Sequence, residues 1–158
     1  MVKVGAQSID GQGKLTYYHS GDIYQGDVVD FAANGNGTVS YKKGDSYTGY
    51  MKGDVKEGRG TYSVQNFIVY DGEYRADMRN GKGIQYDLLG NQYNCEWLND
   101  KKHGMCTITL ENGDYSTGRW EKDLKEGKHT FYDSNSNSFI VRKYYKGEQQ
   151  GEDLKIIQ

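Results

Sequence analysis

The sequence predicts an all-β protein, an elongated and slightly curved or twisted single-layer antiparallel sheet built from tandem β-hairpins. One observation is a 23-residue repeat of Tyr and Gly positions along most of the chain. Another is the apolar composition, because the 158 residues include 15 Tyr and 22 Gly but only 28 Leu, Ile, Val and Phe together. So few apolar side chains can cover one face of one sheet but not fill a two-layer core, and the many aromatic residues argue against disorder.

The repeat is defined by positions counted from its first Tyr. Tyr24, Tyr47, Tyr70 and Tyr93 stand 23 residues apart, and the next step reaches Ser116. Three further positions are mostly Gly: the second (Gly26, Gly49, Gly72, Cys95, Gly118), the eleventh (Gly35, Gly58, Gly81, Gly104, Gly127) and the thirteenth (Gly37, Gly60, Gly83, Cys106, His129). Five units in register indicate a repeat architecture.

Each unit is predicted to form one hairpin. Residues 24–28 alternate in polarity as a half-buried strand does, the largely polar segment 53–58 forms a six-residue turn, and residues 60–64 alternate again. Gly-Asp and Gly-Asn pairs then turn the chain into the next unit, at Gly44–Asp45, Gly90–Asn91 and Gly113–Asp114. The second and thirteenth positions should face each other, leaving a shallow trough for neighbouring Tyr rings.

The third unit departs from this pattern. Gln85 and Asp87 fall on the otherwise aromatic face, which suggests a local bulge or an altered register.

We expect a single domain, residues 1–158. It begins with a partial repeat at 1–23, continues with repeats at 24–46, 47–69, 70–92, 93–115 and 116–143, and ends with a cap at 144–158. Six hairpins give about 12 strands and a sheet roughly 50 Å long. The apolar segments Phe67–Ile68–Val69 and Phe139–Ile140–Val141 are candidates for extra contacts or for capping, and Leu154–Ile157 could shield the last sheet edge.

These motifs resemble the membrane occupation and recognition nexus (MORN) repeat. The segment Tyr70–Asp71–Gly72–Glu73–Tyr74 followed by Gly81–Lys82–Gly83 is nearly a consensus copy, and the resemblance covers about residues 11–150. It implies a curved single-layer sheet with an aromatic groove that serves as a scaffold and binds a partner helix in some members. Cys95, Cys106, Ser116 and His129 depart from the pattern.

The first functional hypothesis is a non-enzymatic scaffold that binds a helical or extended segment of a protein partner. A single layer leaves its aromatic face uncovered, and Tyr and Trp are common at binding hot spots. The groove is predicted to comprise Tyr47, Met51, Tyr62, Tyr70, Tyr74, Tyr93, Trp97 and Trp120. A homodimer is a further option, and the resemblance favours a cytoplasmic protein, associated with the cytoskeleton or a cilium.

Cys95 and Cys106 raise the question of a disulfide or a metal site, with His103 near in sequence. We favour two small buried thiols that fill the glycine trough in a reducing compartment, because zinc-ligand spacings are absent. No metal and no cofactor are therefore expected.

Other classes of function fit less well. The net charge of −2 does not indicate nucleic-acid binding. Acidic phospholipid is the second hypothesis but is not favoured, because the lysines of the turns alternate with acids rather than cluster. A regulatory repeat domain of a larger enzyme is the third. No catalytic triad or phosphate loop is apparent, since pairs such as Gly58 and Gly60 open strands rather than helices.

Overall fold

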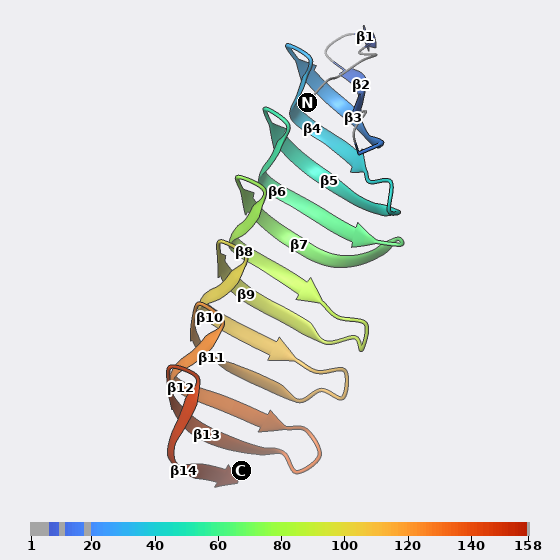
Figure 1. The fold of residues 1–158 in the computed structure, drawn as a ribbon. Helices are drawn as coiled ribbons and strands as arrows, with labels where there is room; N and C mark the ends of the chain where they lie inside the picture. Colours follow the sequence, from blue (N-terminus) through green and yellow to red (C-terminus); the bar gives the residue numbers. More distant parts are fainter. Residues whose placement is uncertain (1–6, 10–11, 18–19, 158) are drawn as a thin grey trace. The chain divides into compact units, whose positions relative to one another are not determined.

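The computed structural model describes residues 7–9, 12–17 and 20–157, and within these residues every regular element is a β-strand. The chain divides into two compact units, residues 1–78 and 79–158. In each unit, every strand is hydrogen-bonded to the strand that follows it in the chain and runs antiparallel to it (Figure 1). The all-β, single-layer fold predicted from the repeat is thereby confirmed.

The first unit contains seven strands. They are β1 (Gln7–Ile9), β2 (Gln12–Tyr17), β3 (Asp22–Val29), β4 (Ala32–Ser40), β5 (Asp45–Lys52), β6 (Val55–Val64) and β7 (Phe67–Arg75).

The second unit contains the other seven. They are β8 (Met78–Tyr86, whose first residue is assigned to the first unit), β9 (Gln92–Leu98), β10 (Lys101–Thr109), β11 (Tyr115–Glu121), β12 (Leu124–Asp133), β13 (Ser138–Tyr145) and β14 (Glu148–Ile157). The described residues thus hold 14 strands rather than the expected 12, because short strands form at the N-terminal end and the C-terminal segment adds another.

The turn inside each hairpin is tighter than the sequence suggested. The predicted six-residue turn at 53–58 is wrong, because β5 ends at Lys52 and β6 begins at Val55. Gly53 and Asp54 both have positive φ, as in the type I′ turns that match strand twist. The same holds for Ala76–Asp77, Asn99–Asp100 and Lys122–Asp123.

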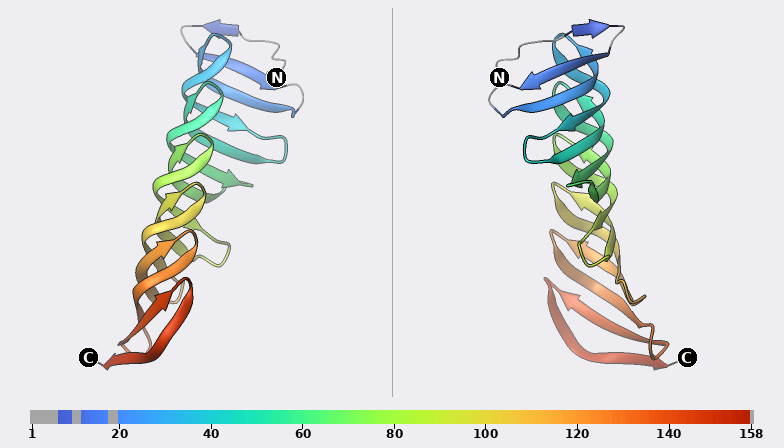
Figure 2. Two further views of the ribbon diagram at one scale, coloured as in Figure 1. Left: turned by 60° about the vertical axis from the view of Figure 1, so that its left-hand side comes forward. Right: turned by 90° about the vertical axis from the view of Figure 1, so that its right-hand side faces the viewer.

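A bulge absorbs the remaining residues of the expected turn. In the β5–β6 hairpin, Gly49 pairs with Gly60 but Met51 pairs with Lys56, so Tyr50 alone lies opposite residues 57–59. Comparable shifts occur in β3–β4, β9–β10 and β11–β12. Because a bulge bends a strand and increases its twist, the hairpins of each unit curl near their turns rather than lie flat (Figure 2).

The turns between hairpins follow the prediction. Gly44, Gly90 and Gly113 have φ between 84° and 95°. Their amides donate to the carbonyls of Tyr41, Asp87 and Leu110 respectively. A left-handed residue in a four-residue turn is the role that glycine fills without steric cost.

The pairing of β8 with β9 is regular around Gln85, and the register shift of the third repeat lies instead between β6 and β7, where Tyr62 pairs with Tyr70 but Ser63 pairs with Ile68. Ile84, Gln85 and Tyr86 pair in sequence with Asn94, Tyr93 and Gln92. The two polar side chains on the aromatic face are instead hydrogen-bonded, since Arg79 Nη1 donates to Gln85 Oε1 at 2.9 Å and the Tyr93 hydroxyl donates to Asp87 at 3.0 Å.

The C-terminal segment covers the edge of β13, as expected. Leu154 pairs with Val141 and Ile156 with Phe139. Of the two apolar segments, Phe139 contacts the ring of Tyr132 at 5.0 Å, whereas Phe67 and Ile68 are exposed. A contact between Phe67, Ile68 and another chain remains a prediction.

Candidate interaction face

The aromatic face is built around glycine pairs that lie opposite each other. Gly26 pairs with Gly37 and Gly49 with Gly60, which confirms the predicted trough. A Cβ atom at Gly60 would overlap the ring of Tyr47, and one at Gly37 would overlap the ring of Tyr24. Each ring therefore lies flat on the backbone of the opposite strand, where no side chain other than hydrogen fits.

The hydroxyl of the first Tyr of the repeat donates to the same backbone carbonyl in each of three repeats. Tyr24, Tyr47 and Tyr70 donate to the carbonyl three residues ahead, at Asp27, Tyr50 and Glu73, over 3.0 to 3.2 Å. In the β3–β4 and β5–β6 hairpins this satisfies a carbonyl at the bulge. Burial, helped by Asp27, raises the pKa of Tyr24 to about 12, so this hydroxyl stays a protonated donor.

His129 takes over this role where the repeat has Ser116 instead of Tyr. Its ring occupies the space above Gly118, and its Nε2 donates to the carbonyl of Arg119 at 2.8 Å. Arg119 is three residues after Ser116, so the same carbonyl is satisfied by a ring from the opposite strand. Two departures from the repeat thus compensate each other, a link that sequence spacing alone did not reveal.

In the fourth repeat, two cysteine side chains occupy the trough. Tyr93 turns toward Asp87, and Cys95 and Cys106 lie directly opposite each other with 4.0 Å between their Cα atoms. The structure joins them as a disulfide. The expectation of two separate thiols is therefore corrected, because the paired glycine positions place the two sulfurs in contact.

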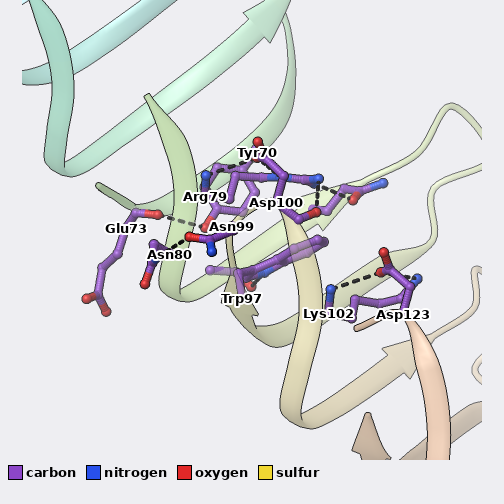
Figure 3. Close-up of polar contacts among 11 residues, drawn as sticks. Tyr70, Glu73, Arg79, Asn80, Trp97, Asn99, Asp100, Lys102 and Asp123 are labelled. Carbon is purple, nitrogen blue, oxygen red and sulfur yellow. Dashed lines mark hydrogen bonds and ion pairs between the residues drawn. The ribbon is translucent and has the colours of Figure 1, made fainter. Parts of the chain in front are cut away.

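A basic residue lies over the aromatic rings in four successive repeats, always nine positions after the position that Tyr usually occupies. Lys56 Nζ lies 5.3 to 5.8 Å from the ring centres of Tyr47, Tyr62 and Tyr74. Arg79 stacks at 4.0 Å on Trp97 and pairs with Asp100 at 3.0 Å (Figure 3). Lys102 and Lys125 continue the series. The sequence did not lead us to expect these cations on the aromatic face, although the common 23-residue spacing of Lys56, Arg79, Lys102 and Lys125 indicates a shared position in the repeat.

The eight predicted groove residues differ in exposure. Tyr47, Met51, Tyr70, Tyr74, Trp97 and Trp120 are 9% exposed or less, so each is core of the repeat rather than open surface. Tyr62 and Tyr93 are half-buried. Among these eight residues only Tyr62 and Tyr93 are partly accessible, and the binding of a partner by the predicted groove remains a prediction.

The part of the aromatic face that stays accessible forms a hollow in each of the two compact units. In the first, a hollow of about 640 Å³ is lined by Ser20, Asp22, Tyr41, Lys42, Lys43, Asp45, Lys56 and Tyr62. In the second, a hollow of about 340 Å³ is lined by Ile108, Leu110, Asp114, Tyr115, Ser116, Phe131, Tyr132, Asp133 and Ile140. Both are lined by tyrosines together with aspartates, and aromatic residues are enriched at protein interfaces.

The residues that the structure describes contain no cluster of three or more His, Cys, Asp or Glu side chains able to hold a metal ion. They also contain no helix of the length and hydropathy needed to cross a membrane.

Comparisons with known proteins agree with this architecture. The family model of the MORN repeat matches residues 47–64, 70–87 and 96–115. Among solved structures, the fold is similar to the TCP domain of SAS-4 (dCPAP) from Drosophila melanogaster, in complex with a proline-rich motif of Ana2 (dSTIL). The TM-score is 0.53 at 15% identity, over 99% of this chain and 90% of that one. No curated protein sequence matches significantly. Three tandem matches show that the chain contains MORN repeats, and the first two coincide with the β5–β6 and β7–β8 hairpins.

Proposed function

We propose that this chain is a non-enzymatic protein-interaction scaffold that holds a segment of a partner protein against the aromatic side of its sheet. The observation that carries the proposal is the pair of half-exposed aromatic hollows, around Tyr41 and Tyr62 in the first unit and around Phe131 and Tyr132 in the second. Exposed aromatic surface of this kind stabilises complexes when a partner excludes water from it.

The fold supports the proposed scaffold function. The MORN repeat is a scaffold architecture, and the similar TCP domain of SAS-4 is described with a bound proline-rich motif. An extended segment suits a shallow hollow between tyrosines, because aromatic-lined grooves recognise extended peptides. The two hollows therefore favour a segment that is extended, at least where it meets them.

The titratable groups with shifted pKa values do not form a catalytic set. Burial is the largest cause of the raised pKa of Tyr41 and of Tyr62. His129 is sealed under the rings of Trp120 and Tyr144. These groups serve packing and hydrogen bonding, which favours binding over chemistry.

A pull-down from native lysate tests the proposal. The tagged wild type is compared with two double variants, Tyr41→Ser/Tyr62→Ser and Tyr132→Ser/Ile140→Ser, each shown to be folded by circular dichroism. Tyr145→Ser is the matched control, because Tyr145 is 56% exposed and lines neither hollow. We expect a partner protein to be lost with at least one double variant and retained by the control.

Retention of every partner by both folded double variants would overturn the proposal. Light scattering of the purified chain, run alongside, shows whether the partner is a second copy of the chain.

A further inference from the structure

Three cations of the second compact unit gather on the rings of three neighbouring strands, β11, β12 and β13. Lys125 Nζ lies 4.8 Å from the ring centre of Phe131, 4.9 Å from Tyr144 and 5.9 Å from Trp120. Lys102 lies 4.7 Å above Trp120, and the Arg142 guanidinium lies 4.8 Å above Phe131. The rings partly stabilise these charges through their electron-rich faces.

The three cations are not equally neutralised. Arg142 forms a two-pronged pair with Asp153 at 2.9 to 3.0 Å, and Lys102 lies 3.8 Å from Asp123. Among the described residues, no carboxylate lies within ion-pair distance of Lys125. Burial, followed by the charges of Arg142 and Lys102, lowers the pKa of the Lys125 ammonium. A half-buried cation beside two others and without a counter-charge favours the approach of an anion.

An apolar hollow begins beside this cluster. Phe131 belongs to both, since its ring contacts Lys125 and Arg142 and also lines the hollow of about 340 Å³. Ile108, Leu110 and Ile140 form the apolar remainder of its wall. The volume suits one or two large apolar side chains rather than a folded domain.

We infer that this part of the second unit binds an acidic, apolar segment of a partner protein, with an Asp or Glu carboxylate on Lys125 and a neighbouring large apolar side chain in the hollow. The inference rests on the proposed scaffold function and adds the location of the site and the chemical class of its partner.

A membrane surface fits the same place less well. Asp114 and Asp133 line the hollow, and their pKa values are lowered by hydrogen bonds from Ser134 and Ser136, so both carry negative charge at neutral pH. They repel a continuous anionic surface, whereas a peptide brings its carboxylate to the Lys125 end alone.

The test uses a phage-displayed library of random 12-residue peptides selected on the full chain. Selected peptides are labelled with fluorescein, and their affinities are measured by anisotropy for wild type, Lys125→Met, Lys125→Arg and Lys143→Met. Lys143→Met is the matched control, because Lys143 is an exposed cation of the same unit, one residue from Arg142. Met retains the apolar stem of Lys125 on the rings while removing its charge.

We expect peptides rich in acid next to Leu, Ile or Phe. Their affinity should fall at least tenfold with Lys125→Met, recover with Lys125→Arg and not change with Lys143→Met. Replacing the peptide acids with amides should have the same effect as Lys125→Met.

Two outcomes would overturn the inference while leaving the proposed function in place: selected peptides without acidic residues, or acidic peptides that bind folded Lys125→Met as well as wild type. A failure to select any peptide, with binding instead to vesicles containing phosphatidylserine, would contradict both proposals and favour the membrane.

Discussion

At the scale of single residues, aromatic rings resting on glycine backbones hold the repeats together. Tyr47 covers Gly60, and His129 covers Gly118 from the opposite strand. In both cases the ring also satisfies a carbonyl near the bulge, so one side chain supplies apolar contact and a hydrogen bond. The glycine positions of the repeat are therefore steric requirements of the facing rings.

We predict that Gly60→Ala destabilises the protein by about 2 to 3 kcal/mol, because its Cβ would overlap the Tyr47 ring. Urea denaturation followed by circular dichroism measures the change. Arg59→Ala is the control, since the neighbouring Arg59 side chain is 79% exposed. An equal, small effect of both variants would contradict the ring-on-glycine account.

His129 predicts a dependence of stability on pH. Its burial is the largest cause of a lowered pKa, and Lys125 lowers it further. The unfolded chain binds a proton at the ordinary histidine pKa of about 6.5, while the folded chain resists protonation. The stability that this residue contributes is thus complete above about pH 6.5 and is lost as pH falls below it, by at most about 1.4 kcal/mol at pH 5.5.

Urea denaturation at pH 7.5 and 5.5 tests this expectation for wild type and His129→Phe. The variant retains a ring but cannot titrate, so the difference between its two stabilities should be smaller than in wild type. An unchanged difference would show that other groups cause the pH dependence.

At the scale of elements, an aspartate in four of the hairpin turns ties one hairpin to a strand of the preceding one. Asp123 accepts from the Lys102 amide at 2.9 Å, and its own amide donates to the Lys102 carbonyl at 2.9 Å. Asp54 with Ala33, Asp77 with Lys56 and Asp100 with Arg79 repeat this reciprocal pair. The turns thereby add hydrogen bonds between neighbouring hairpins beyond those of the sheet.

Asp123→Ala should cost about 1 to 2 kcal/mol, because it removes the acceptor and leaves a Cβ-bearing residue at a φ of 71° without the local bonds that stabilise it. Asp123→Asn retains an acceptor oxygen and tolerates this φ, so thermal melting should place it within about 0.5 kcal/mol of wild type. If the two variants melted together, the hydrogen bonds of the turn would not be the stabilising feature.

His103 interrupts a second series of turn contacts. The residue ten positions after the repeat Tyr accepts an amide of the next turn at Asn34, Glu57 and Glu126, over 3.0 to 3.1 Å. At the same position His103 has a buried Nδ1 without a hydrogen-bond partner among the described residues.

His103→Asn should therefore raise stability by about 0.5 to 1.5 kcal/mol by restoring the acceptor. Chemical denaturation at pH 7.5 measures it, with His19→Asn as a control for loss of a histidine elsewhere in the sequence. A neutral or destabilising result would show that the imidazole is already well accommodated.

At the scale of the whole molecule, stability is expected to depend on contacts between neighbouring repeats. The long-range side-chain hydrogen bonds join residues about 20 positions apart, from one unit of the repeat to the next. In such arrays each repeat is stabilised by its neighbours rather than by one central core.

Tyr47→Ala should accordingly have a local effect. It removes a fully buried ring on Gly60 and the bond to the Tyr50 carbonyl, so hydrogen exchange measured by mass spectrometry should increase in β4 to β7. Protection in β11 to β14 should change much less. A uniform loss of protection along the chain would instead indicate one cooperative folding unit.

Much of the fold was predictable because the sequence repeats. Tyr24 and Gly26 recur with a constant spacing, and a constant spacing permits only one hairpin register along the array. The bulges were not predictable, since residues 53–58 are largely polar and carry no signal that separates a long turn from a tight turn followed by a bulge. The burial of the predicted groove residues could not be predicted either. The basic side chain that covers the rings, such as Lys56, lies beside the bulge.

The sequence by itself determined the strands, the hairpin order and the pairing of the glycine positions, since alternation and period are local properties of the chain. Only the tertiary structure decided that His129 replaces a missing Tyr, that Cys95 meets Cys106, and that Trp97 is core while Tyr62 stays half-open. These outcomes depend on which side chain occupies a shared space between two strands. Packing decides it, because a ring from either strand can satisfy the same carbonyl, and the ring that fills the space leaves no room for a second one.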